Sequence, residues 1–271
     1  MIALAGLDAP LAGALRARYG PYVRDEEPGP DALRVTVGRD ERDYYLDPPE
    51  RAEFNPLFLA CDGDRVRVTS YRAAGWLDTP PGPARGVLLL ARGGYEPESH
   101  AVENYVRVAV AWRAATRGGA LVHGASAIRH GRGYLFFGES GAGKSTLSAH
   151  AGPSATVVSD DLSLVLPGPN GPQLVGSPFR GTFEEGEPVT GSVPLAAAFR
   201  IVKSERAEVR TLPRAVLMAG LVGNLPFVAE ALGARPDLWE GIEEAFATVP
   251  LASLQFRKDD SYWAAIEAAG L

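Results

Sequence analysis

Cysteine and histidine are scarce in this sequence. Cys61 is the one cysteine among 271 residues, so an internal disulfide cannot form. The four histidines show no metal-ligand spacing with it, which argues against a zinc site. Disulfide-free chains are typical of reducing compartments, so we expect a cytoplasmic protein.

Long apolar runs and an excess of positive charge are also absent. No stretch approaches the roughly 18 apolar residues that indicate a membrane-spanning helix. Residues 1–15 are apolar but lack a basic leading segment and contain Asp8 and Pro10, which favours a capped helix start over a secretion signal. The net charge of −6 supplies no positive field for nucleic acid or an anionic membrane. We therefore expect neither partner.

The remaining composition is that of an ordinary globular protein. Hydrophobic residues make up 46% of the chain and charged residues 22%. The 31 glycines and 22 prolines are scattered through periodic segments, which indicates many turns rather than disorder. The length suits one large domain or two modest ones.

The pattern changes near residue 120 and predicts two domains, over residues 1–119 and 120–271. In the first, β-branched and aromatic runs between turn residues predict a small antiparallel sheet. Its strands are expected at 33–37, 43–46, 66–71 and 87–90. Apolar residues at helical spacing predict a connecting helix over 101–116, closed by Gly118 and Gly119.

Strands and short helices alternate in the second domain, which is an α/β pattern. Strands are predicted at 120–128, 134–137, 156–159 and 249–256, and helices at 146–149, 212–232, 236–247 and 259–269. We expect Tyr262, Trp263 and Ile266 to face the core from the last helix. Trp239 and Phe246 are expected to be core residues as well, in keeping with the usual burial of aromatic side chains.

A phosphate-binding loop is the most specific motif. Residues 138–145, Gly-Glu-Ser-Gly-Ala-Gly-Lys-Ser, satisfy G-x-x-x-x-G-K-[ST] at every fixed position, between an apolar strand and a helix-forming segment. The glycines let backbone N–H groups face phosphate oxygens, while Lys144 meets the β and γ phosphates and Ser145 ligates Mg²⁺. The alternative is a chance match in a glycine turn. The predicted nucleotide-binding residues are Gly138, Glu139, Ser140, Gly141, Ala142, Gly143, Lys144, Ser145 and Thr146.

A pair of acids follows the next predicted strand. Phosphoryl transfer at such a loop requires a second acidic group at the end of a neighbouring strand, and Asp160 and Asp161 end the strand at 156–159. Because successive side chains on a strand alternate between faces, one carboxylate can serve the metal and the other the acceptor. A solvated turn before Leu162 is the other interpretation.

His123 lies on the strand that is expected to form a hairpin with the strand before the phosphate loop. Taken alone, a histidine on an apolar strand is more often a hydrogen-bonded core residue than a catalytic group. Resemblance to a known family is what makes it a candidate.

His123-Gly124, the loop at 138–145 and Ser159-Asp160-Asp161 together resemble the kinase domain of HPr kinase/phosphorylase. The likeness covers roughly residues 120–203. It implies a P-loop fold like that of phosphoenolpyruvate carboxykinase, with a mixed sheet and flanking helices, plus a smaller N-terminal α+β domain. It also implies ATP and Mg²⁺ as cofactors, a small protein or peptide as phosphate acceptor, and assembly into a homo-oligomer.

The resemblance assigns roles to the candidate residues. The second acid of the pair is the family's general base, which here is Asp161; such a base takes the proton from the acceptor hydroxyl. Asp160 and Ser145 would then bind the metal and Lys144 the phosphate charge. His123 would also belong to the active site.

The match weakens downstream of the acid pair. Arg180 stands in an Arg-Gly segment where it would bind phosphate or an acceptor carboxylate, although a tight turn with a surface arginine also explains it. Pro178 occupies the position of the family's metal-binding glutamate, and Glu184 or Glu185 are the candidates to replace it.

The region before residue 120 shows no likeness to the family's regulatory domain, so HPr itself is not the expected substrate. The chain looks closer to the HPr kinase-related proteins encoded beside peptide-modifying genes. The leading hypothesis is an ATP-dependent serine or threonine kinase that acts on a small protein or peptide.

Two other functions compete with that hypothesis. A small-molecule kinase with the same core would need a closed, acceptor-sized pocket. A nucleotide-driven switch would bind partners without forming a phosphorylated product. The acid pair and His123 argue against the switch, because a nucleotide-driven switch does not require this set of catalytic side chains.

Overall fold

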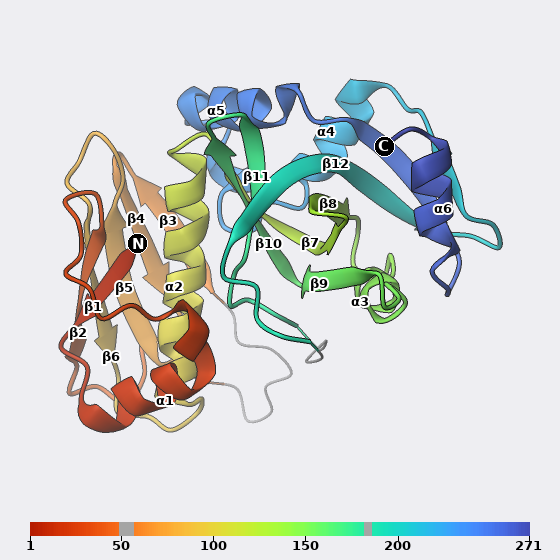
Figure 1. Ribbon diagram of the computed structural model, residues 1–271. Helices are drawn as coiled ribbons and strands as arrows, with labels where there is room; N and C mark the ends of the chain where they lie inside the picture. The colour runs from red at the N-terminus through yellow and green to blue at the C-terminus, as the bar shows by residue number, and fades with distance from the viewer. Residues whose placement is uncertain (49–56, 182–185) are drawn as a thin grey trace. The chain divides into compact units, whose positions relative to one another are not determined.

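The computed structural model describes residues 1–48, 57–181 and 186–271 (Figure 1). The chain forms two compact units, Met1–Arg113 and Ala114–Leu271. Each is a mixed α/β unit with one mixed sheet and several helices. Within the described ranges, no helix is both long and apolar enough to cross a membrane.

A six-stranded sheet forms the first unit, in the order β1-β2-β6-β5-β4-β3. The strands are β1 (Ile2–Ala5), β2 (Leu33–Arg39), β3 (Phe58–Asp62), β4 (Arg65–Thr69), β5 (Ala73–Asp78) and β6 (Arg85–Leu90). β1, β2 and β6 run parallel, and the other neighbours are antiparallel. The prediction of an antiparallel sheet is therefore wrong for this half. Neither parallel pair is joined by a hairpin: a helical crossover connects β1 to β2, and β3, β4 and β5 lie between β2 and β6 along the chain.

That crossover is α1 (Ala9–Tyr19), followed by the short η1 (Gly20–Tyr22). As predicted, Asp8 caps α1, accepting a hydrogen bond from the Leu11 amide at 3.0 Å, and Pro10 lies in the first turn. The predicted strand at 43–46 is absent, because this segment forms bends.

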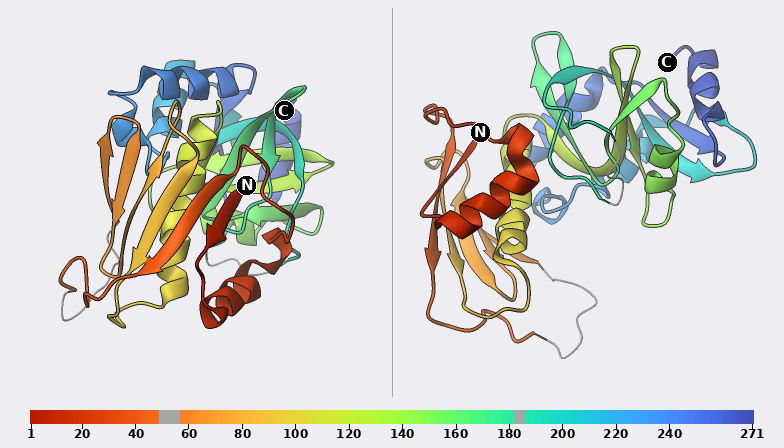
Figure 2. Two further views of the ribbon diagram at one scale, coloured as in Figure 1. Left: turned by 90° about the vertical axis from the view of Figure 1, so that its left-hand side faces the viewer. Right: turned by 60° about the horizontal axis from the view of Figure 1, so that its bottom comes forward.

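The expected connecting helix is α2 (Glu98–Ala115). Figure 2 shows α1 and α2 side by side, and Arg18 of α1 forms an ion pair with Glu103 of α2 at 2.8 Å.

The sheet of the second unit runs β11-β10-β7-β8-β12-β14-β13, with β9 paired to β7 and β11 also paired to β12. The strands are β7 (Ala120–Arg129), β8 (Arg132–Phe137), β9 (Ala155–Ser159), β10 (Leu162–Gly168), β11 (Gly171–Val175), β12 (Ser192–Lys203), β13 (Glu208–Arg210) and β14 (Leu251–Phe256). β8, β12 and β14 are parallel to one another. β7 pairs with β8 as the predicted antiparallel hairpin.

Helices α3 (Lys144–Ala149), α4 (Arg214–Val222), α5 (Pro236–Ala247) and α6 (Ser261–Ala268) complete this unit with the short η2 (Ala229–Ala231). The prediction of one helix over 212–232 is wrong. α4 ends at Gly223, and Pro226 cannot donate the backbone hydrogen bond that a continued helix requires. α5 spans the predicted residues, with Phe246 buried and Trp239 half-buried.

β8 is buried on both faces. On one face, Phe136 packs against Tyr262 and Trp263 of α6, with ring centroids 6.0 and 5.9 Å away. On the other, Phe137 approaches Gly220 of α4. These contacts confirm that Tyr262 and Trp263 point inward, as does Ile266. They also fix the point at which β8 ends and the phosphate loop begins.

Candidate functional site

The phosphate loop joins β8 to α3 in a conformation that two glycines permit. Gly141 and Gly143 have φ angles of 78° and 107°, in the left-handed region that other residues rarely occupy. A Cβ at position 143 would also lie 2.8 Å from Cζ of Phe256. Glycine is therefore required at position 143 for two reasons, the backbone angle and the close packing of β14.

Lys144 lies over its own loop. Its ammonium donates to the carbonyl oxygens of Gly138 at 2.8 Å and Glu139 at 3.3 Å, and the residue is 8% exposed. Burial lowers the pKa of Lys144, and the nearby carboxylate of Asp161 acts in the opposite direction. The loop thus binds the Lys144 ammonium through uncharged carbonyl oxygens. Phosphate oxygens, which carry negative charge, can replace these carbonyls as hydrogen-bond acceptors.

His123 of β7 and Asp161 are brought together by strand pairing. His123 pairs with Leu162 in the β7–β10 ladder, and the Gly124 amide donates to the Asp161 carbonyl at 2.9 Å. The side chains then meet with 3.6 Å between Nε2 of the histidine and Oδ1 of the aspartate. Burial lowers the pKa of His123, the charge of Lys144 lowers it further, and Asp161 opposes both. The balance favours a neutral imidazole.

Asp160 is the buried member of the acid pair, at 3% exposure. Its Oδ1 accepts a hydrogen bond from the Gly181 amide at 2.7 Å. A Cβ at position 181 would lie 3.0 Å from the second carboxylate oxygen, so the chain at Gly181 rests directly on this side chain.

Ser159 holds the turn that carries both acids. Its hydroxyl accepts hydrogen bonds from the amides of Asp161 and Leu162, both at 3.1 Å, and donates to the Phe179 carbonyl at 2.7 Å. Ser159 is fully buried, so these bonds are shielded from water. These hydrogen bonds fix the backbone that carries Asp160 and Asp161.

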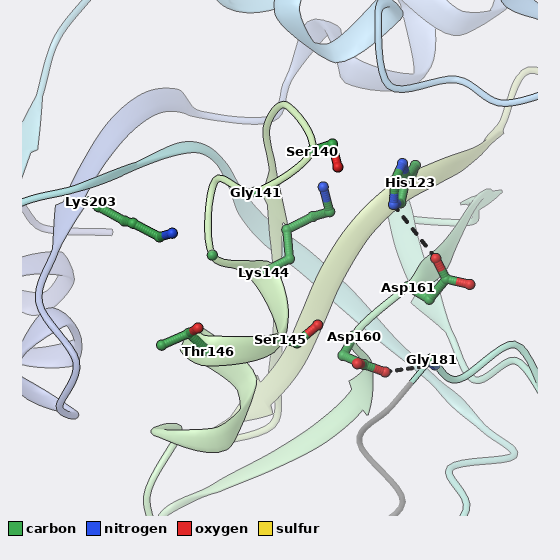
Figure 3. A pocket seen from close by; sticks show the side chains of 11 residues that line it. His123, Ser140, Gly141, Lys144, Ser145, Thr146, Asp160, Asp161, Gly181 and Lys203 are labelled. Carbon is green, nitrogen blue, oxygen red and sulfur yellow. Dashed lines mark hydrogen bonds and ion pairs between the residues drawn. The ribbon is translucent and has the colours of Figure 1, made fainter. Parts of the chain in front are cut away.

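The phosphate loop, His123 and the acid pair line one cleft of about 400 Å³ (Figure 3). It brings together most of the predicted site, and Gly181 and Lys203 also line it. The predicted residues in its wall are His123, Ser140, Gly141, Gly143, Lys144, Ser145, Thr146, Asp160 and Asp161.

Other predicted residues lie outside the cleft wall. Gly138 and Glu139 contribute carbonyls to Lys144, and the Ala142 amide donates to Glu139 within the loop. Arg180 does not line the cleft: its guanidinium donates to the carbonyls of Gly186 at 3.0 Å and Glu187 at 2.9 Å. The structure thus gives Arg180 a loop-bracing contact. Glu184 and Glu185 fall outside the described residues.

Sequence reasoning missed two residues of the wall. Gly181 directly follows Arg180, but only its backbone takes part, so no side-chain pattern marks it. Lys203 is a basic residue at the carboxyl end of β12, which runs parallel to β8. Ligand-binding groups gather at the carboxyl ends of such strands, and this position was the available signal.

Over residues 101–268, more than half of the chain, the sequence matches the model of a protein family described as SynChlorMet cassette protein ScmC. The chain belongs to the ScmC family. No curated protein matches it.

This finding corrects the resemblance proposed from short motifs. The matching model is that of the ScmC family, and no HPr kinase family model matches, so assignment to HPr kinase/phosphorylase is wrong. The phosphate loop and an Asp-Asp pair are short features that unrelated families can share. Any roles for Asp161 and His123 must therefore rest on the geometry of the cleft.

Proposed function

We propose that the ScmC-family chain binds ATP with Mg²⁺ in this cleft and transfers the terminal phosphoryl group to a serine or threonine hydroxyl of a small protein or peptide. One observation carries the proposal. His123, Lys144, Asp160 and Asp161 come from different parts of the second unit and line one cleft with the phosphate loop. Phosphoryl transfer at such a loop requires a carboxylate for the metal, a carboxylate to act as base and a cation for the phosphates, and these meet here beside His123.

The residues fit a nucleotide-bound magnesium ion. Among the described residues, no group of three or more His, Cys, Asp or Glu side chains is placed to hold a metal alone. Magnesium commonly takes one or two carboxylates and completes its coordination with phosphate oxygens and water. Asp160 and Ser145 would hold it, and bound magnesium neutralises charge on the phosphates.

The acceptor proton goes to Asp161 in this proposal. The acceptor oxygen forms the new bond to the γ phosphorus, its proton passes to the Asp161 carboxylate, and the bond to the β-phosphate oxygen breaks with its electron pair leaving on ADP. His123 borders this carboxylate, with its Nε2 3.6 Å from Oδ1 of Asp161. Lys144 exchanges its loop carbonyls for β and γ phosphate oxygens.

The cleft volume supports an acceptor that arrives from outside. About 400 Å³ is near the lower end of the roughly 300–1,000 Å³ of ligand pockets, so a nucleotide leaves little room for a separate small molecule.

We also propose a core of the phosphoenolpyruvate-carboxykinase type, supported by the β7–β8 hairpin that leads into the loop within a mixed sheet. The exposed thiol of Cys61 is consistent with a cytoplasmic location.

Transfer of label from γ-labelled ATP in the presence of Mg²⁺ tests the function. The acceptors are a size-fractionated host lysate, divided into metabolites, peptides and proteins. We expect labelled serine or threonine in the peptide or protein fraction, lost with both Lys144→Ala and Asp161→Asn. Label in the metabolite fraction would indicate a small-molecule kinase, and tight ATP binding without any labelled product would indicate a switch.

A further inference from the structure

Lys203 is a second cation in the cleft wall. It ends β12, and its backbone is fixed by the parallel β12–β14 ladder, in which it pairs with Phe256. The next residue, Ser204, donates its amide to the Phe256 carbonyl at 2.8 Å. The side chain of Lys203 is exposed, while its backbone is held in place at the end of β12.

The lysine stem borders the phosphate loop. Its Cε lies 3.1 Å from where a Cβ at Gly143 would be, so the absence of a side chain at Gly143 lets the lysine approach the loop backbone. The side chain of Lys203 forms no hydrogen bond or ion pair with any residue in the described part of the chain. Of the three lysines in the sequence, Lys144 and Lys203 line the cleft, and Lys258 does not.

The two cleft lysines occupy different positions along it. Figure 3 shows Lys203 on one side of the loop and His123 with Asp161 on the other, with Lys144 between them. Lys203 therefore lies on the other side of Lys144 from the residues proposed to act in transfer (Figure 3).

We propose that Lys203 binds the phosphate next to the nucleoside and so sets the direction in which the nucleotide lies. The inference rests on the proposed nucleotide site. A triphosphate is a linear chain of charges, and its transferred end must lie at Asp161. The cation at the opposite end then meets the α-phosphate, which ATP and ADP share. Lys203 is a binding residue that stabilises the bound nucleotide before and during transfer alike.

Nucleotide affinity of Lys203→Met, measured by calorimetry, tests this role. We expect about tenfold weaker binding of both ATP and ADP, the loss of one charge-assisted contact. The maximal transfer rate at saturating ATP should stay within about twofold, because uniform binding changes KM rather than kcat. Lys203→Arg should restore most of the affinity, and Lys258→Met, the matched control, should bind as the wild type does.

Two outcomes would overturn the inference. One is wild-type affinity in Lys203→Met under conditions where Lys144→Ala weakens binding; the other is a loss confined to ATP with a fall in kcat, which would place Lys203 at the γ-phosphate. Failure of the proposed function looks different. If the wild type transfers no phosphoryl group but Lys203→Met still weakens ADP binding, phosphoryl transfer is wrong and the role of Lys203 stands.

Discussion

The backbone of Gly181 rests on the carboxylate of Asp160. The amide donates to Oδ1 at 2.7 Å, and an added Cβ would lie 3.0 Å from Oδ2. Asp160 is almost completely buried, so its carboxylate has little room to retreat. A side chain at position 181 must therefore move either the acid or the chain segment that carries it.

Gly181→Ala should weaken magnesium-dependent ATP binding by about tenfold, because it displaces the carboxylate proposed to hold the metal. Binding is measured by calorimetry with Mg²⁺ and again with EDTA. Gly191→Ala is the matched control, since a Cβ there meets nothing within 4 Å. Equal magnesium dependence in Gly181→Ala and the wild type would show that Asp160 does not hold the metal.

Asp161→Asn should separate binding from transfer. The amide cannot accept the proton from the acceptor, so we expect kcat to fall by roughly 10²–10⁴ while ATP affinity stays near that of the wild type. Transfer of labelled phosphate under single-turnover conditions measures the rate. Asp62→Asn, an exposed position in the first unit, serves as control. A fully active Asp161→Asn enzyme would exclude this residue as the base.

The pKa of His123 should respond to its two charged neighbours with opposite signs. Lys144 lowers this pKa and Asp161 raises it, so Lys144→Met should move the titration midpoint up and Asp161→Asn should move it down. The measurement is NMR of the imidazole resonances against pH. Lys258→Met should leave the midpoint unchanged. A shift in the same direction for both cleft variants would contradict the described geometry.

The same shift predicts how stability depends on pH. His123 has a folded pKa below its unfolded value of about 6.5, so the unfolded chain binds more protons between the two values. The contribution of His123 is therefore neutral above pH 6.5 and becomes destabilising as the pH falls toward the folded pKa. His123→Gln should flatten this part of the profile, measured by urea unfolding at several pH values. An unchanged slope would argue against the lowered pKa.

Trp263→Phe should destabilise the second unit. The indole donates to the Ala151 carbonyl at 2.8 Å, and Trp263 is buried, so the substitution leaves that acceptor unpaired. We expect a loss of about 1–2 kcal/mol in the free energy of unfolding. Chemical denaturation measures it, with Trp239→Phe on α5, a half-buried position, as the control. Equal stability changes would show that the hydrogen bond contributes nothing.

Local patterns were sufficient where the structure depends on neighbouring residues. α5 begins at Pro236 and ends at Ala247 as predicted, because proline suits a helix start and the apolar spacing continues for three turns. β8 follows from an apolar run, and Asp8 caps α1 through a bond three residues away. These elements need no distant partner to be specified.

Elements that depend on distant partners were missed or misjudged. β1 has four residues, too few to show alternation, and becomes a strand by pairing with β2 across α1. The segment 212–232 is apolar enough for one helix, yet Pro226 interrupts it. The family assignment also failed, since short motifs carry less information than a match over residues 101–268.

The sequence by itself determined the phosphate loop, because the residues of that motif are contiguous and glycine angles such as that of Gly143 are local properties. It also identified His123 and Asp161 as candidate site residues. Only the tertiary structure decided which side chains meet the loop. Strand pairing, driven by burial over long sequence separations, brings Lys203 to the cleft wall and leaves Arg180 bracing a neighbouring loop.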